Sequence, residues 1–136
     1  SHLSAKVDVA AFEIIDTPSS FGPELKEGLG QQCLHIQRVH LLEKARTAYA
    51  EIYIPGKYGA NFTKADVESR TIYQLYEEKL HMQLGRGKAL QIPEGWPVLS
   101  IRRRAYNAQG ELVEYMVMTY EYTQYSFDVE LNLSSR

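Results

Sequence analysis

The sequence of 136 residues lacks several features that would indicate particular classes of protein. It has one cysteine, Cys33, which excludes an internal disulfide and suits a reducing compartment such as the cytoplasm. Lys and Arg number 15 against 17 Asp and Glu, so there is no basic excess of the kind that binds nucleic acid. No apolar run approaches membrane-spanning length, and no signal peptide is visible. Contact with DNA is therefore expected only from a part of the protein outside this chain.

The familiar motifs of enzymes and metal sites are also missing. There is no nucleophile elbow, His-Glu-x-x-His motif, dinucleotide fingerprint or zinc-type Cys/His spacing, so the sequence predicts no metal and no cofactor. The stretch Gly85-Arg86-Gly87 lacks the spacing of a phosphate-binding loop and is expected to be a turn. Glu51 and Glu114 leave a paired-carboxylate acid–base site open, although nothing in the sequence brings them together.

Tyrosine, in contrast, is abundant. The chain has ten Tyr against four Phe and one Trp. Tyrosine combines apolar area with a hydrogen-bonding tip, a mixture that suits ligand pockets and interfaces alike. The remaining composition, 44% hydrophobic and 24% charged, is that of an ordinary globular protein, and the length fits one domain.

Hydrophobic periodicity and chain breakers predict an α+β fold with an antiparallel sheet. We expect a strand over 5–16, a short helix ending before Gly30, and a hairpin of strands over 33–42 and 47–54. A loop begins at Pro55, and a helix capped by Ser69 runs from Arg70 to about His81. A second hairpin has strands over 98–106 and 113–122, and a terminal strand covers 127–131.

Alternation divides the predicted strands into faces. On the return strand of the last hairpin one face carries Glu114, Met116, Met118, Tyr120 and Tyr122. The other face carries Val113, Tyr115, Val117 and Thr119. On the first strand alternation separates Val7, Val9 and Ala11 from Phe12 and Ile14.

The strand over 33–42 leaves two orientations open, because a period of two does not say which face is buried. Its even face carries Leu34, Ile36, Arg38 and His40, and its odd face Cys33, Gln37, Val39 and Leu41. If the even face is inward, the guanidinium of Arg38 needs an anionic partner. Arg38, His40, Glu114 and Tyr120 would then form a polar constellation suited to a small anionic or hydroxylated ligand.

Glu114 has a second interpretation, a salt bridge with a neighbouring arginine such as Arg102 or Arg104. Arg102-Arg103-Arg104 alternates between the two faces of a strand, so we expect a solvated strand with one internal arginine rather than a basic patch.

The stretch PEGWPVLSIRRRAYNAQGELVEY (93–115), followed by TQYSFDVEL (123–131), resembles the C-terminal signature of the UTRA domain. That domain is the effector-binding half of HutC-type regulators in the GntR family. Weaker similarities over 36–40, 50–55 and 71–75 extend the resemblance to nearly the whole chain.

The resemblance implies a chorismate-lyase-like α+β fold in a bacterial transcription regulator that forms a homodimer. It implies a small-molecule effector bound in a cleft of the sheet, with no catalysis. It also implies that four residues bind the ligand. They are Arg38, a phosphate-binding arginine, Thr71, a hydroxyl at a helix start, Glu114, a carboxylate that grips sugar hydroxyls, and Tyr120. The polar constellation adds His40 as a fifth candidate.

The chain departs from the family pattern in four respects. The winged-helix DNA-binding half is absent, so residues 1–136 are expected to be the effector-binding and dimerisation domain alone. His40 stands where many relatives carry a second arginine, which puts a phosphorylated ligand in doubt. Thr123-Gln124 replaces an acidic–basic pair. Between Leu84 and Gln91 the family has another strand and a short helix, so either a strand was lost or, as we favour, the sequence joins two segments across a missing stretch.

Two other functions remain open at this level. One is a chorismate-lyase-like, pyruvate-releasing enzyme on the same fold, using an arginine and Glu114 as acid and base. The other is a dimerisation module with a vestigial pocket.

Overall fold

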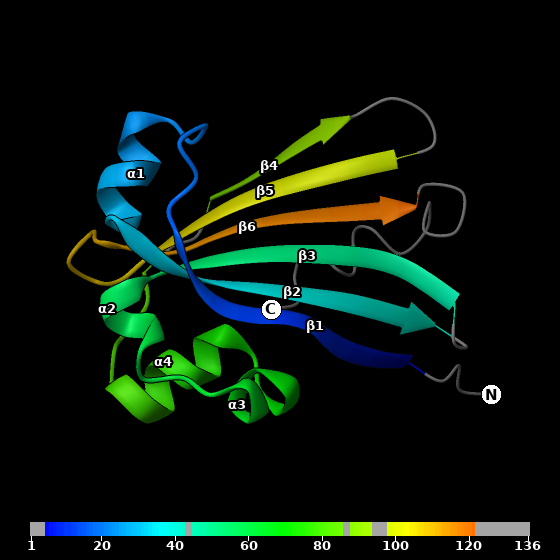
Figure 1. Ribbon diagram of the computed structural model, residues 1–136, viewed down its shortest axis with the longest axis horizontal. Helices are drawn as coiled ribbons and strands as arrows, with labels where there is room; N and C mark the ends of the chain where they lie inside the picture. Colours follow the sequence, from blue (N-terminus) through cyan, green and yellow to red (C-terminus); the bar gives the residue numbers. More distant parts are fainter. Residues whose placement is uncertain (1–4, 43–44, 86–87, 94–97, 122–136) are drawn as a thin grey trace.

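The computed structural model describes residues 5–42, 45–85, 88–93 and 98–121. It is one six-stranded antiparallel sheet with helices on both faces (Figure 1). In chain order the elements are β1 (Ala5–Asp16), α1 (Pro23–Leu29), β2 (Gln32–Leu42), β3 (Ala45–Pro55), α2 (Gly56–Gly59), α3 (Lys64–Ser69), α4 (Ile72–Leu80), β4 (Lys88–Pro93), β5 (Val98–Tyr106) and β6 (Leu112–Glu121). The strands lie side by side in the order β1-β2-β3-β6-β5-β4.

The predicted α+β architecture is confirmed, and the predicted bounds of β1 and β5 agree with the structure. β2 and β3 are each slightly longer than alternation indicates. None of the described helices has the length and hydropathy needed to cross a bilayer. The predicted terminal strand over 127–131 lies outside the described residues.

The loop expected from Pro55 is wrong in part, because it contains the short helices α2 and α3. Helices of four and six residues are too short to show an apolar period. The available signal was the capping box of α3, in which Thr63 and Asp66 each accept a hydrogen bond from the other's backbone N–H, at 3.1 and 2.9 Å.

The cap predicted for the next helix is also corrected. Thr71, not Ser69, is the N-cap of α4. The Ser69 hydroxyl instead donates to the carbonyl of Ala65 within α3. β4 was not predicted, and it forms the sheet edge by pairing with β5. Whether further residues belong between Leu84 and Gln91 stays a prediction.

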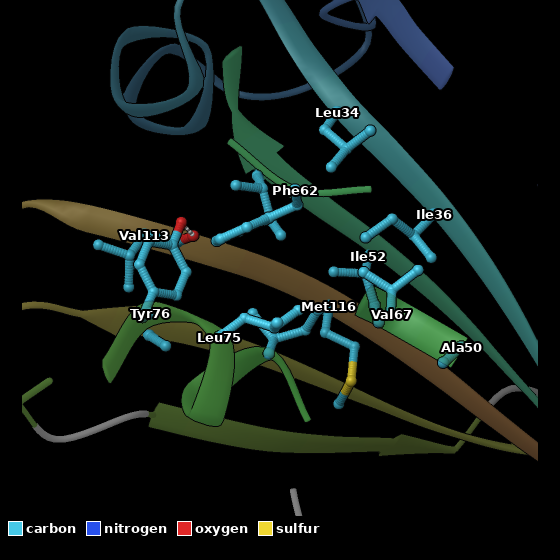
Figure 2. Packing of buried hydrophobic residues seen from close by; sticks show 13 residues of the cluster. Leu34, Ile36, Ala50, Ile52, Phe62, Val67, Leu75, Tyr76, Val113 and Met116 are labelled. Carbon is cyan, nitrogen blue, oxygen red and sulfur yellow. Dashed lines mark hydrogen bonds between the residues drawn. The ribbon is translucent and has the colours of Figure 1, made fainter. Parts of the chain in front are cut away.

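Two hydrophobic clusters hold the helices against the sheet. On one face, side chains of α3 and α4 pack on β2, β3 and β6 (Figure 2). This cluster includes Leu34, Ile36, Ile52, Val67, Leu75, Tyr76 and Met116. On the other face α1 packs through Leu25, Leu29, Cys33, Leu112 and Tyr115. We call these the α4 face and the α1 face of the sheet.

Register shifts occur at three places in the sheet, between Val9 and Ala11, between His40 and Leu41, and between Ala105 and Tyr106, and two of them overturn predicted face assignments. The shift between Val9 and Ala11 puts Val9 and Phe12 against the same cluster on the α4 face, although strict alternation separates them. The shift between Ala105 and Tyr106 of β5 lies opposite Leu112–Glu114 of β6. As a result Val113 packs on the α4 face, the same face as Glu114, although strict alternation puts these two residues on opposite faces.

The bulge at Val113 of β6 is held by a hydrogen bond from α4. The buried hydroxyl of Tyr76 on α4 donates to the carbonyl of Val113 at 2.5 Å, a contact visible in Figure 2. A bulge leaves a residue out of the ladder, so its backbone groups need other partners. Burial raises the pKa of Tyr76 above its ordinary range, which keeps the phenol a donor.

Candidate functional site

The orientation of β2, open from the sequence, is decided by burial and packing. Leu34 and Ile36 are buried in the cluster of the α4 face. Because alternate residues share a face, Arg38 and His40 also lie on the α4 face, and both are half-buried. The even face of β2 is therefore inward, as the ligand hypothesis requires.

Cross-strand register brings further predicted residues to the same face. Ala48 and Ala50 of β3 lie between the polar residues of β2 and strand β6, and both alanines are buried. Tyr120 is buried beside Ala48 and Ile101. The two cross-strand rows are Arg38–Ala50–Met118 and His40–Ala48–Tyr120.

Arg38 is held by the end of α3. Its Nη2 donates to the carbonyls of Val67 at 3.0 Å and Arg70 at 2.9 Å, which lie in the last turn of the helix and just beyond it. These carbonyls lack partners within a helix, so a cation there acts as a cap. The Nε of Arg38 is buried and has no hydrogen-bond partner among the described residues.

Burial lowers the pKa of Arg38, and the charges around it act in opposite directions: Glu114 raises that pKa and Arg103 lowers it. The three side chains therefore share one electrostatic environment. Burial and the charge of Arg38 also lower the pKa of His40. Because its pKa is lowered from 6.5, the imidazole of His40 is mainly uncharged at neutral pH while the site is empty.

Glu114 is the most deeply buried ionisable residue at the site, with 1% of the residue exposed. Its Oε1 accepts a hydrogen bond from Nη2 of Arg103 at 3.1 Å. Its Oε2 is buried and has no partner in the part of the chain that the structure describes. Buried polar atoms are paired in the great majority of cases, so an unpaired carboxylate oxygen calls for an explanation.

Arg103 is the site residue that sequence reasoning missed. The salt bridge expected between Glu114 and a neighbouring arginine is confirmed, but the two arginines named for it are wrong, because Arg102 is exposed and Arg104 contacts Glu24. The expectation of one internal arginine is confirmed. The guanidinium of Arg103 lies 5.5 Å from the ring centroid of Tyr73 on α4, and its Nε is buried without a described partner.

Thr71 begins α4 above the same face. Its hydroxyl oxygen accepts from the backbone N–H of Gln74 at 3.1 Å, and the Gln74 side chain accepts from the N–H of Thr71 at 2.9 Å. This capping box accounts for one lone pair of the hydroxyl and leaves its proton available. Thr71 therefore has a structural role whether or not it contacts a ligand.

The α1 face carries a second polar cluster, centred on Glu51. One carboxylate oxygen of Glu51 bonds to His35 and the other accepts from Gln37 at 2.8 Å. His35 also stacks on Tyr53, with ring centroids 5.0 Å apart. Glu51 and Glu114 lie on opposite faces of the sheet, which excludes a paired-carboxylate site between them. Within the described ranges no three His, Cys, Asp or Glu residues gather as metal ligands.

Among curated proteins, none matches the sequence. Solved structures do match. The possible transcriptional regulator YydK from Bacillus subtilis subsp. subtilis str. 168 shares 20% identity over 88% of this chain, with a TM-score of 0.71. The chain spans 58% of the length of YydK.

Two shorter structures are similar over most of their length. A GntR-family transcriptional regulator from Enterococcus faecalis V583 has a TM-score of 0.74 at 15% identity, covering 89% of this chain and 96% of that one. The effector domain of PhnF from Mycobacterium smegmatis has a TM-score of 0.70 at 14% identity, covering 88% and 82%. At these identities the similarity shows a shared fold.

The sequence also matches a family model, that of the UTRA domain, over residues 1–89 and 86–126. The two matched stretches overlap at residues 86–89, where the sequence departs from the family pattern. The match covers well over half of the chain and agrees with the observed sheet and helices. The chain belongs to the UTRA domain family.

Proposed function

We propose that this chain is the effector-binding domain of a GntR-type bacterial transcriptional regulator of the HutC subfamily. It binds a small metabolite on the α4 face of the sheet and thereby controls a winged-helix DNA-binding domain outside this chain. The regulator acts in the cytoplasm as a homodimer and carries out no catalysis. Family membership and the shared fold with GntR-family regulators support this function.

One observation carries the proposal. Among the described residues, Glu114 is buried with one carboxylate oxygen unpaired, and Arg38 and Arg103 on the same face each have a buried Nε without a partner. Leaving a buried donor or acceptor unpaired costs about 1–3 kcal/mol, and more for charged groups. Three such atoms on one face are accounted for if a ligand supplies their partners.

The contact of Arg38 with α3 provides a route from ligand to conformation. An acidic ligand group competes with the carbonyls of Val67 and Arg70 for the same guanidinium. The ligand then favours states in which the end of α3 is released, and a differential contact of this kind is what shifts a conformational equilibrium.

The test is a metabolite screen by thermal shift on this chain, followed by titration calorimetry of the hits. At least one small polar metabolite should raise the melting temperature, and Arg38→Met should abolish its binding. Arg102→Met, which removes an exposed arginine of the opposite face, should bind as the parent does. A broad screen without any hit, or full affinity in Arg38→Met, would refute the proposal.

A further inference from the structure

The charges on the α4 face specify the ligand more closely than its location alone. Arg103 and Glu114 form an ion pair at 3.1 Å in which 13% and 1% of the side chains are exposed. Their charges cancel, so this end of the site has no net charge to offer. A ligand group that carries a full charge would face one partner of the pair with the same sign.

The pair nevertheless has unused hydrogen-bonding capacity. Arg103 presents a buried donor, Nε, and Glu114 presents a buried acceptor, Oε2, and neither has a partner within the described ranges. A group that accepts from one and donates to the other satisfies both. Hydroxyl and primary amide groups do this, whereas a carboxylate only accepts and an ammonium only donates.

The other end of the site has one cation. Arg38 lies beside His40, which is neutral at physiological pH. Arg38 already donates two hydrogen bonds to the end of α3, and its Nε has no partner among the described residues. One partly engaged guanidinium matches one singly charged acid group. A phosphate monoester, with a charge near −2 at neutral pH, would remain under-neutralised there.

We propose that the ligand is a small hydroxy acid or acid amide with a single carboxylate at Arg38 and a hydroxyl or amide group held between Arg103 and Glu114. Arg103 thereby becomes a ligand-contacting residue. This inference rests on the proposed function, because it names the chemical class bound at that same site.

The first experiment compares matched probes by calorimetry and ligand-observed NMR on this chain. Glycerate, threonate and gluconate represent the proposed class. Hexanoate lacks the hydroxyls, glucose lacks the acid, and glucose 6-phosphate carries the doubly charged ester. At least one hydroxy acid should bind at least tenfold more tightly than hexanoate, glucose and glucose 6-phosphate.

The other outcomes overturn the inference. If glucose 6-phosphate binds more tightly than every hydroxy acid, the charge argument is wrong and the effector-binding function stands. If no hydroxy acid binds while the metabolite screen finds a ligand of another class, the ligand class is again wrong and the function stands. If neither the probes nor the screen finds a ligand, both proposals fail.

Variants separate a ligand contact from a structural ion pair. Arg103→Lys keeps the charge but removes Nε and the planar fork, and it should weaken hydroxy-acid binding at least tenfold. The matched control, Arg102→Lys on the adjacent residue of the opposite face, should bind as the parent does. Unchanged binding by Arg103→Lys would overturn the assignment of Arg103.

A second variant tests the same pair without deleting a side chain. Glu114→Gln keeps the shape but leaves Arg103 unneutralised, so this end of the site should now accept a second acid group. The ratio of glucarate to gluconate affinity should rise at least tenfold over the parent. An ion pair that only holds the fold would not change this ratio, and an unchanged ratio would overturn the proposal.

Discussion

Glu51 and Glu114 lie on neighbouring strands, and each has a described hydrogen bond, but they differ in burial and in how many of their carboxylate oxygens are bonded. On the α1 face both oxygens of Glu51 are bonded, and 32% of its side chain is exposed. On the α4 face one oxygen of Glu114 has no partner in the described part of the chain, and 1% of its side chain is exposed. The face with better access to water is the one whose carboxylate is fully satisfied.

The difference lies in how completely the residues of each cluster satisfy one another's hydrogen bonds. Glu51, His35 and Gln37 form a closed set that needs nothing further, as expected of groups that stabilise a fold. The cluster around Glu114 has the more costly burial and the incomplete pairing, an arrangement typical of binding sites. Removing single partners from each cluster tests whether this contrast is real.

The largest effect is expected from Arg103→Ala, which leaves Glu114 buried without its described ion-pair partner. Breaking a buried pair in this way typically costs about 3–5 kcal/mol. Urea unfolding at pH 7 measures the loss, and Arg102→Ala serves as the exposed control, with a change within about 0.5 kcal/mol. A loss below that of the control would contradict the burial of the pair.

Arg38→Met should cost about 1–3 kcal/mol, because the carbonyls of Val67 and Arg70 lose a charged donor. Its apolar stem still covers the sheet. Hydrogen exchange should show faster exchange of the amides of α3 than in the parent, while those of α1, on the other face, keep their protection. Uniformly faster exchange in both helices would show that Arg38 does not act through α3.

His40 gives the α4 face a dependence on pH. Its folded-state pKa is lowered from 6.5, so below about pH 6.5 unfolded chains bind a proton that the folded protein resists. Stability should therefore fall on acidification below pH 6.5, with a slope of at most about 1.4 kcal/mol per pH unit for one proton. Asp66 and Glu111, whose pKa values are lowered by ion pairs, lose their contributions only below about pH 4.5.

Urea unfolding of His40→Gln across pH 5–7 isolates this contribution. The variant should show a flatter dependence on pH than the parent over this range. An equal slope in both proteins would assign the acid sensitivity to other groups.

The smallest effect is expected on the α1 face. Gln37→Ala removes one partner of Glu51 but leaves His35, and water reaches the freed oxygen. The loss should stay below about 1 kcal/mol in urea unfolding, as for other partly exposed bonds to a carboxylate. A loss as large as that of Arg103→Ala would erase the contrast between the two faces.

Much of the fold was predictable because its strands are long and alternate clearly, as β1 and β5 do. The failures have specific physical causes. Two bulges reversed the alternation, and nothing in the local sequence marks where a ladder skips a residue. The helices α2 and α3 are too short for periodicity, and β4 is a short edge strand.

The site could be predicted only in part. Arg38, His40 and Glu114 were indicated by polar residues in an apolar alternation, but their face had to come from the tertiary structure. The sequence around Arg103 carried a local signal that the prediction did not use. Ile101 and Ala105, two positions before and after it, are buried, so the middle arginine of the three shares their inward face.

The bulge in β6 has a consequence for how such a domain can change its ligand. It turns two successive residues to the same face, so Val113 fills the core while Glu114 faces the proposed ligand site. The backbone of Val113 is fastened to α4 by Tyr76, independently of the side chain at 114. In the proposed sensor, a substitution at position 114 changes the ligand contact and breaks the ion pair with Arg103, whereas the hydrogen bond that fastens the strand to α4 is kept. A new side chain at position 114 therefore needs a matching change at Arg103, while the path of the strand stays fixed.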